Sequence, residues 1–139
     1  MKVTMLLADA AQAVGGKLFI LGGGWSVTGP GPAAMALAIK IEVPWDRTNE
    51  RHHWVLDLVD EDGRAVQVGG PEGARPVQIA GDFEVGRPAG VALGTPIDLP
   101  LAITIGPLQL PPGTRCVWQL AIDDEADPHW QVAFSVRPA

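Results

Sequence analysis

Leu37-Ala38-Ile39-Lys40-Ile41-Glu42-Val43 is the stretch of sequence that decides the fold, because large apolar side chains alternate in it with small or charged ones. Successive side chains on a β-strand point to opposite faces, so this period of two predicts a strand with one buried and one solvent-facing side. The same alternation recurs over residues 99–105, 116–122 and 130–136. The recurrence predicts an all-β protein.

Seventeen glycines and thirteen prolines divide the chain into short segments. The pattern predicts strands near residues 3–8, 17–27, 34–43, 52–60, 64–68, 77–85, 98–106, 115–123 and 130–137. Strands with one apolar face each must bury those faces against one another. This predicts an antiparallel two-sheet β-sandwich of about eight or nine short strands, with a closed or partly open β-barrel as the alternative.

The predicted core is made of the inward-facing side chains of these strands. They are Leu18, Ile20, Leu37, Ile39, Ile41, Trp54, Leu56, Leu58, Val77, Ile79, Phe83, Leu101, Ile103, Trp118, Leu120, Trp130, Val132 and Phe134. Asp60–Gly63 is typical of a hairpin turn, and 111–113 and 124–128 are predicted connections. Ala8–Val14 is the one segment that could form a short helix, which Gly15-Gly16 would end. Nothing divides the chain, so residues 1–139 are expected to form one domain.

The composition disfavours several partners. A net charge of −6 and a pI near 4.8, with only 10 Lys and Arg, argue against nucleic acid and against anionic membrane surfaces. The apolar run Val3–Ala8 is shorter than the core of a signal peptide and is predicted to be the first strand. No stretch reaches the length of a membrane helix. The lone Cys116 forms no intrachain disulfide and is predicted to be a buried, inert thiol, which fits a cytoplasmic location.

Acidic side chains gather in two predicted turns. Asp60 and Asp62 lie in one, and Asp123 and Asp124 in the other. Carboxylates converging from two turns are a possible Ca²⁺ site, although the spacing matches no EF-hand loop. Solvated turns are the simpler reading of both clusters.

The remaining motifs predict no catalytic residue, no metal ligand beyond that calcium alternative and no cofactor. His52 and His53 are neighbours on a strand, so they face opposite ways and are expected to pack across strands. The Gly22–Gly24 triplet lacks the Lys and Ser/Thr of a phosphate loop and indicates a bulge or a close backbone approach. Neither Ser26 nor Ser135 lies in a Gly-x-Ser-x-Gly motif.

Two tryptophans fall outside the core pattern. Trp45 follows Pro44 in a polar segment, and Trp25 follows the glycine triplet. Indoles in such positions are enriched at binding sites, and they also plug the open ends of sandwiches. Trp25 and Trp45 are therefore the candidate partner or ligand contacts.

Several stretches together resemble a known family. They are 9–12, 16–22, 58–63, 83–88, 110–113, 118–123 and 130–136, which span nearly the whole chain. The sequence resembles a bacterial domain-of-unknown-function family of small, free-standing β-sandwich proteins from high-GC, actinobacterial-type genomes. The resemblance implies the sandwich fold and implies no catalytic residue.

The leading expectation is therefore a non-enzymatic protein-binding or assembly module that self-associates or docks on a protein partner. The alternative is a β-sandwich that binds a small ligand or carbohydrate through its loop tryptophans. A third, less favoured reading is an enzyme that uses carboxylates such as Asp57, Asp60 or Asp123, but no pair of these can be argued to flank a substrate.

Overall fold

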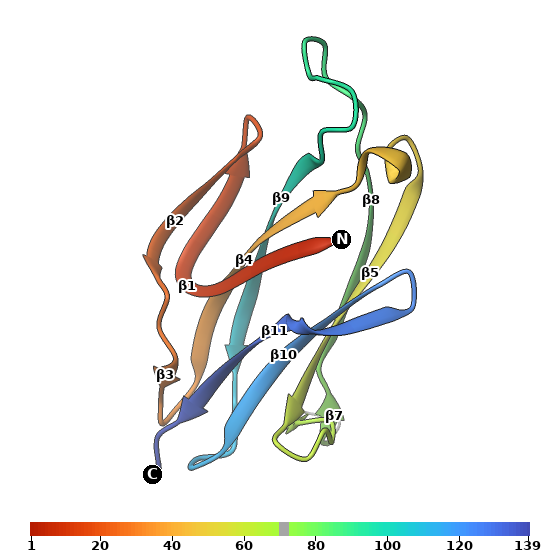
Figure 1. The fold of residues 1–139 in the computed structure, drawn as a ribbon. Coiled ribbons are helices and arrows are strands. Elements are labelled where there is room, and N and C mark those ends of the chain that lie inside the picture. Colours follow the sequence, from red (N-terminus) through yellow and green to blue (C-terminus); the bar gives the residue numbers. More distant parts are fainter. Residues whose placement is uncertain (70–72) are drawn as a thin grey trace.

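The computed structural model describes residues 1–69 and 73–139 (Figure 1). The described residues form strands, turns and a single-turn 3-10 helix, Trp45–Arg47, and they include no α-helix. The predicted all-β class is confirmed. No helix in the described part of the chain is long and apolar enough to cross a membrane.

One sheet has four strands in the order β2-β1-β4-β9. These are β2 (Lys17–Gly23), β1 (Lys2–Val14), β4 (Ala33–Val43) and β9 (Ile97–Leu108). Every neighbouring pair in this sheet is antiparallel. The stretch that decides the fold is β4, which lies between β1 and β9 and places Leu37, Ile39 and Ile41 in the core with no exposed surface.

The second sheet has five strands in the order β3-β11-β10-β5-β8. They are β3 (Val27–Thr28), β11 (Glu125–Val136), β10 (Arg115–Ile122), β5 (Arg51–Asp60) and β8 (Gln78–Glu84). The short strand β3 runs parallel to β11, so the prediction of a wholly antiparallel arrangement is wrong for this pair. β3 crosses from β2 to the other sheet and runs alongside the last strand of the chain (Figure 1).

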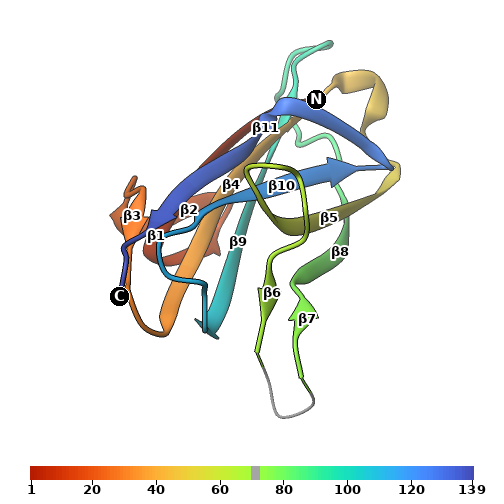
Figure 2. The same ribbon diagram turned by 90° about the horizontal axis from the view of Figure 1, so that it is seen from below.

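The two small strands β6 (Gln67–Val68) and β7 (Arg75–Pro76) form a sheet of their own. Figure 2 shows them side by side in an arm that projects from the body of the molecule. One of the sheets is curled into a half-barrel. Strong twist lets a sheet curve round, so that one part of it faces another part of the same sheet.

Side chains from both larger sheets meet in one main hydrophobic cluster. Twelve of the predicted core residues are buried, and four, Val77, Ile79, Leu101 and Val132, are half-buried at its margin. The prediction is wrong for Ile20, which is 42% exposed, and Leu18 packs only against a small satellite cluster around Ala36 and Ala38. Both residues belong to β2, which contributes no side chain to the main cluster.

Several predicted strand bounds are wrong. The predicted strand 17–27 is divided into β2 and β3, which lie in different sheets, and within 64–68 only Gln67–Val68 is strand. Ala8–Val14 forms no helix but continues the first strand, and Gly15-Gly16 is the tight turn into β2. Residues 125–128 are also strand, so the connection from β10 to β11 is only Asp123-Asp124. The predicted turn at Asp60–Gly63 is confirmed, with the Gly63 amide donating to the Asp60 carbonyl at 3.1 Å.

Candidate functional site

The Asp123-Asp124 turn is the first structural element of the polar site. Both residues have positive φ, 52° and 64°, which is the backbone of a type I′ hairpin turn. Aspartate tolerates this left-handed conformation better than most residues. The turn is fastened to β5 by a hydrogen bond from the Asp123 amide to the His53 carbonyl at 2.7 Å. It therefore directs the Asp123 carboxylate toward the beginning of β5.

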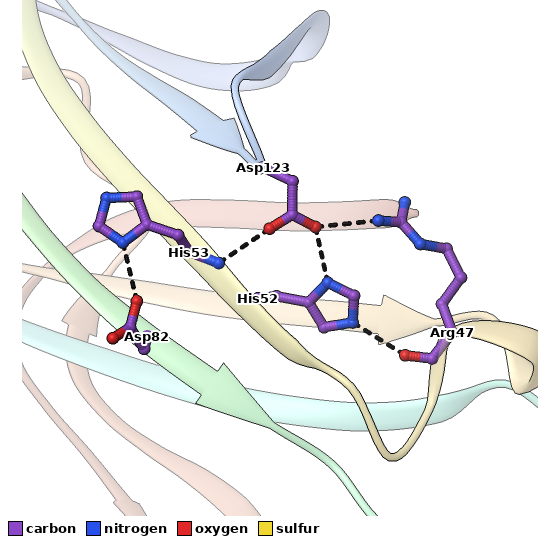
Figure 3. Close-up of polar contacts among 5 residues, drawn as sticks. All are labelled: Arg47, His52, His53, Asp82 and Asp123. Carbon is purple, nitrogen blue, oxygen red and sulfur yellow. Dashed lines mark hydrogen bonds and ion pairs between the residues drawn. The ribbon is translucent and has the colours of Figure 1, made fainter.

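The Asp123 carboxylate accepts three hydrogen bonds (Figure 3). Its Oδ2 accepts from Arg47 Nη2 at 2.9 Å and contacts His52 Nδ1 at 2.6 Å. Its Oδ1 accepts from the His53 amide at 2.9 Å. Partial burial acts to raise the pKa of Asp123, but the hydrogen bonds from His53 and His52 and the charges of His52 and Arg47 hold that pKa below its ordinary value.

His52 is buried, with 1% of its surface exposed, and both ring nitrogens are engaged. Nε2 lies 2.8 Å from the Arg47 carbonyl oxygen, and Nδ1 faces the Asp123 carboxylate. Both partners are acceptors, so only a ring that donates from both nitrogens satisfies both contacts. The ring also packs on Phe83, with centroids 5.1 Å apart. Both ring nitrogens of His52 therefore have polar partners, and the contacts of Asp123 with Arg47, His52 and His53, called here the Asp123 clamp, join the turn to β5 and to the loop before it.

The predicted opposite orientation of the neighbouring histidines is confirmed. His53 is exposed and pairs across the strands with Asp82, Nδ1 to Oδ1 at 2.8 Å (Figure 3). His129 is separate from both and contacts Asp127 at 3.0 Å on the surface. The hydrogen bonds from the His129 amide and ring lower the pKa of Asp127. Exposed pairs of this kind contribute little to stability.

Sequence reasoning did not identify the contact of Arg47 and His52 with Asp123. The sequence carries only a weak signal for this contact. The Asp123-Asp124 pair between two alternating runs indicates a two-residue turn, and a histidine on the buried face of a strand, such as His52, needs polar partners. Which turn meets which strand depends on the pairing of β5 with β10, which the sequence does not state.

The two loop tryptophans lie in different surroundings. Trp25 is half-buried, packs edge-on against Phe134 at a centroid distance of 6.1 Å and contacts the main core. Trp45 begins the 3-10 helix, and the guanidinium of Arg87 lies 4.2 Å from the centre of its ring. Arg87 is held there by hydrogen bonds to the Thr48 hydroxyl and the Trp45 carbonyl, each 2.7 Å long. Both indoles therefore pack against other side chains of the chain, and their role as partner or ligand contacts stays a prediction.

The acidic residues proposed for calcium do not converge. β5 and β10 are antiparallel, with Asp60 opposite Cys116 and Trp54 opposite Ile122. The turn that holds Asp60 and Asp62 therefore lies at one end of these strands, and Asp123 and Asp124 lie at the other. Within residues 1–69 and 73–139, no group of three or more His, Cys, Asp or Glu is arranged to hold a metal ion.

The outermost strand of the four-stranded sheet is β2, and its outer edge pairs with no other strand among the described residues (Figure 1). We call this the free edge of β2. Its apolar side chains reach the solvent: Phe19 is 56%, Ile20 42% and Leu21 72% exposed. With the neighbouring residues of β1 they line a depression of about 420 Å³. Gly22, where the sequence predicts a bulge or a close backbone approach, has a positive φ of 62° and lies against the side chain of Asp9, which would have to shift to admit a Cβ atom.

Comparison with known proteins identifies a family that covers nearly the whole chain. The model of a family described as a family of unknown function, DUF6941, matches residues 3–137. No curated protein and no solved structure matches this chain. The match covers the hairpin of β1 and β2, the Asp123 clamp and both loop tryptophans.

Proposed function

We propose that this chain, which belongs to the family of unknown function DUF6941, is a non-enzymatic assembly module that binds an extended protein segment along the free edge of β2. The observation that supports the proposal is the exposed apolar surface of that strand. An edge strand presents unpaired backbone N–H and C=O groups, and added strands pair with them while side-chain contacts provide selectivity.

The other edges of the two larger sheets carry the features by which proteins prevent pairing. β9 contains Pro100 and Pro107, which lack the amide that a ladder requires. β8 carries Asp82 and Glu84, and β3 is only two residues long. β2 has no proline and no acidic residue, and its single charge, Lys17, lies at its first position. The contrast between β2 and the other three edges supports β2 as the docking strand.

The polar clusters support a non-enzymatic role. Both nitrogens of His52 are occupied by acceptors. His53 is exposed beside Asp82 at the beginning of β5. Ser135 lies near the opposite end of β5, because it pairs with Arg115, and the next residue, Cys116, pairs with Asp60. The Ser26 carbonyl accepts from the Ser135 amide, so the second serine lies with the first. No serine is therefore placed for activation by His53.

We also propose that the two larger sheets form a β-sandwich, that the chain is one domain and that it works in the cytoplasm. The shared core of both sheets supports the first two statements. The free, buried Cys116 fits a reducing compartment.

The proposed docking edge is tested by introducing a charged side chain on β2. A tagged chain is expressed in its host together with an untagged copy, as wild type, as Leu21→Lys and as Leu93→Lys. Leu93 is 88% exposed in a loop between β8 and β9, so it is a matched control for the same substitution away from β2. We expect a protein to co-purify with wild type and with Leu93→Lys and to be lost from Leu21→Lys. Equal recovery from all three, or recovery of no protein with any of them, would overturn the proposal.

A further inference from the structure

We infer that the segment bound at this edge is β2 of a second copy of the chain, paired antiparallel about a two-fold axis through Ile20. This inference rests on the proposed docking edge and adds the identity of the partner. The pairing would join two four-stranded sheets into one continuous sheet. A two-fold contact of this type is closed, because each copy uses the same surface and no free copy of the edge remains.

The side chains of β2 complement themselves in this register. A two-fold axis perpendicular to the sheet keeps every side chain on its own face, so Phe19 of one copy lies directly opposite Leu21 of the second. The pair occurs twice by symmetry, and Ile20 meets its own counterpart on the other face. Cross-strand pairs of an aromatic and an aliphatic side chain stabilise antiparallel sheets. These are the three most exposed apolar side chains of the strand, at 56%, 72% and 42%.

The ends of the strand fit as well. Leu18 would lie opposite Gly22 of the second copy, and Lys17 opposite Gly23, so each longer side chain faces a residue without one. Registers displaced by two residues lose this match. Centring on Phe19 places Lys17 opposite Leu21, and centring on Leu21 leaves Phe19 opposite a glycine. The Ile20 register is therefore the one in which Phe19, Ile20 and Leu21 all lie opposite apolar side chains.

The distribution of charge favours a second copy over a charged partner. The chain carries a net charge of −6, with 16 acidic residues. None of them lies in β2, and Leu18–Gly23 carries no charge. Two acidic copies can approach along this surface without opposing their carboxylates, whereas the segment offers an acidic or basic peptide no opposite charge. Like charges directly opposite one another would destabilise the pair, and this register has none.

The experiment measures the mass of the purified protein in solution by sedimentation equilibrium. We expect the wild type and Leu93→Lys to sediment with twice the chain mass of 14.6 kDa at micromolar concentration. Leu21→Lys places a charge opposite Phe19 in both halves of the contact, and we expect it to weaken the dimer at least about tenfold. Leu21 is 72% exposed in the free chain, so this change leaves folding intact.

A cysteine on the axis tests the register. Residues directly opposite each other in an antiparallel pair have Cα atoms about 4.5–5.5 Å apart, within the range of a disulfide. Ile20→Cys is therefore expected to cross-link two copies on mild oxidation, and Leu93→Cys is not. Cys116 has no exposed surface and adds no cross-link of its own.

The outcomes separate the two proposals. A wild-type monomer up to about 100 µM overturns the second copy as the occupant. In that case, a different host protein lost from Leu21→Lys would leave the docking edge intact. A dimer that persists in Leu21→Lys, or that does not cross-link through Ile20→Cys, overturns the pairing described here. Dimerisation sensitive to Leu21→Lys together with the Ile20→Cys cross-link supports it.

Discussion

The Nδ1 atom of His52 lies 2.6 Å from Oδ2 of Asp123, although 71 residues separate the two along the chain. His52 is at the beginning of β5, and Asp123 is in the turn between β10 and β11. Because β5 and β10 are neighbours, this contact closes one end of the five-stranded sheet with side chains as well as with backbone hydrogen bonds. Arg47 joins the loop before β5 to the same carboxylate.

We expect Asp123→Asn to destabilise the protein. Asparagine has nearly the same size and accepts the positive φ of this position, but it carries no charge and has one acceptor oxygen instead of two. If that oxygen takes the place of Oδ2, the contacts with Arg47 and His52 are kept, but the His53 amide faces an NH2 donor. The expected loss in the free energy of unfolding is about 1–3 kcal/mol, measured by urea denaturation at pH 7. Asp124→Asn is the matched control, because Asp124 is exposed and shares the turn. Equal losses in the two variants would contradict the clamp.

The same carboxylate should make stability depend on pH. In the folded protein the pKa of Asp123 lies below its ordinary value of about 3.9, so the folded chain binds this proton less readily than the unfolded chain. The contribution of Asp123 is therefore complete above the ordinary value and is lost as the pH falls through the folded pKa. Urea midpoints measured between about pH 5 and pH 2 should fall less steeply for Asp123→Asn than for the wild type. Parallel pH profiles would contradict this assignment.

Gly81 should not tolerate alanine. It pairs with Trp54 across β8 and β5, and a Cβ atom at Gly81 would lie 2.7 Å from Cζ2 of the indole. Trp54 is only 7% exposed, so it has little room to move away. We expect Gly81→Ala to lower the free energy of unfolding by about 1–3 kcal/mol in thermal or urea denaturation. Gly106→Ala is the control, because Gly106 also lies in a strand and has no atom within 4 Å of the added carbon. A similar loss for Gly106→Ala would show that the effect is not one of packing.

The thiol of Cys116 should be unreactive in the folded protein. Burial, with a smaller effect of the Asp60 charge, raises the pKa of Cys116 to about 11, and the thiolate is the reactive form. Labelling with an aromatic disulfide at pH 8 should therefore be slow in buffer and fast in urea. The rate in buffer should rise in Asp123→Asn if exposure of the thiol requires unfolding. Rapid labelling of the native wild type would contradict the burial of Cys116.

The period of two in the sequence predicted the central strands well, because their alternation reflects a face that packs on another sheet. β4, β5 and β10 begin and end within one residue of the predicted positions. The prediction failed in β2, where apolar side chains occupy both faces of the strand. In β2, Leu18 and Ile20 alternate with Phe19 and Leu21 as they would in a core strand, but all four are apolar, so the pattern does not say which face is covered.

The first strand shows a second limit. Ala8–Val14 is rich in alanine, which favours a helix in isolation, but pairing with β2 makes it a strand. Tertiary pairing overrides such weak local preferences. The Asp123 clamp was missed for a related reason, since it depends on which strands are neighbours. Two acidic turns that look equivalent in the sequence lie at opposite ends of β5 and β10.

The separation of β2 from the main core has a consequence for how the family can diverge. The proposed docking strand, β2, contributes no side chain to the cluster that holds the two larger sheets together. Substitutions on its exposed positions can therefore accumulate with little penalty to folding, and each one changes the surface that a partner meets. We therefore expect a graft of the Lys17–Gly23 segment between relatives to transfer the choice of the proposed partner while the recipient keeps its own stability.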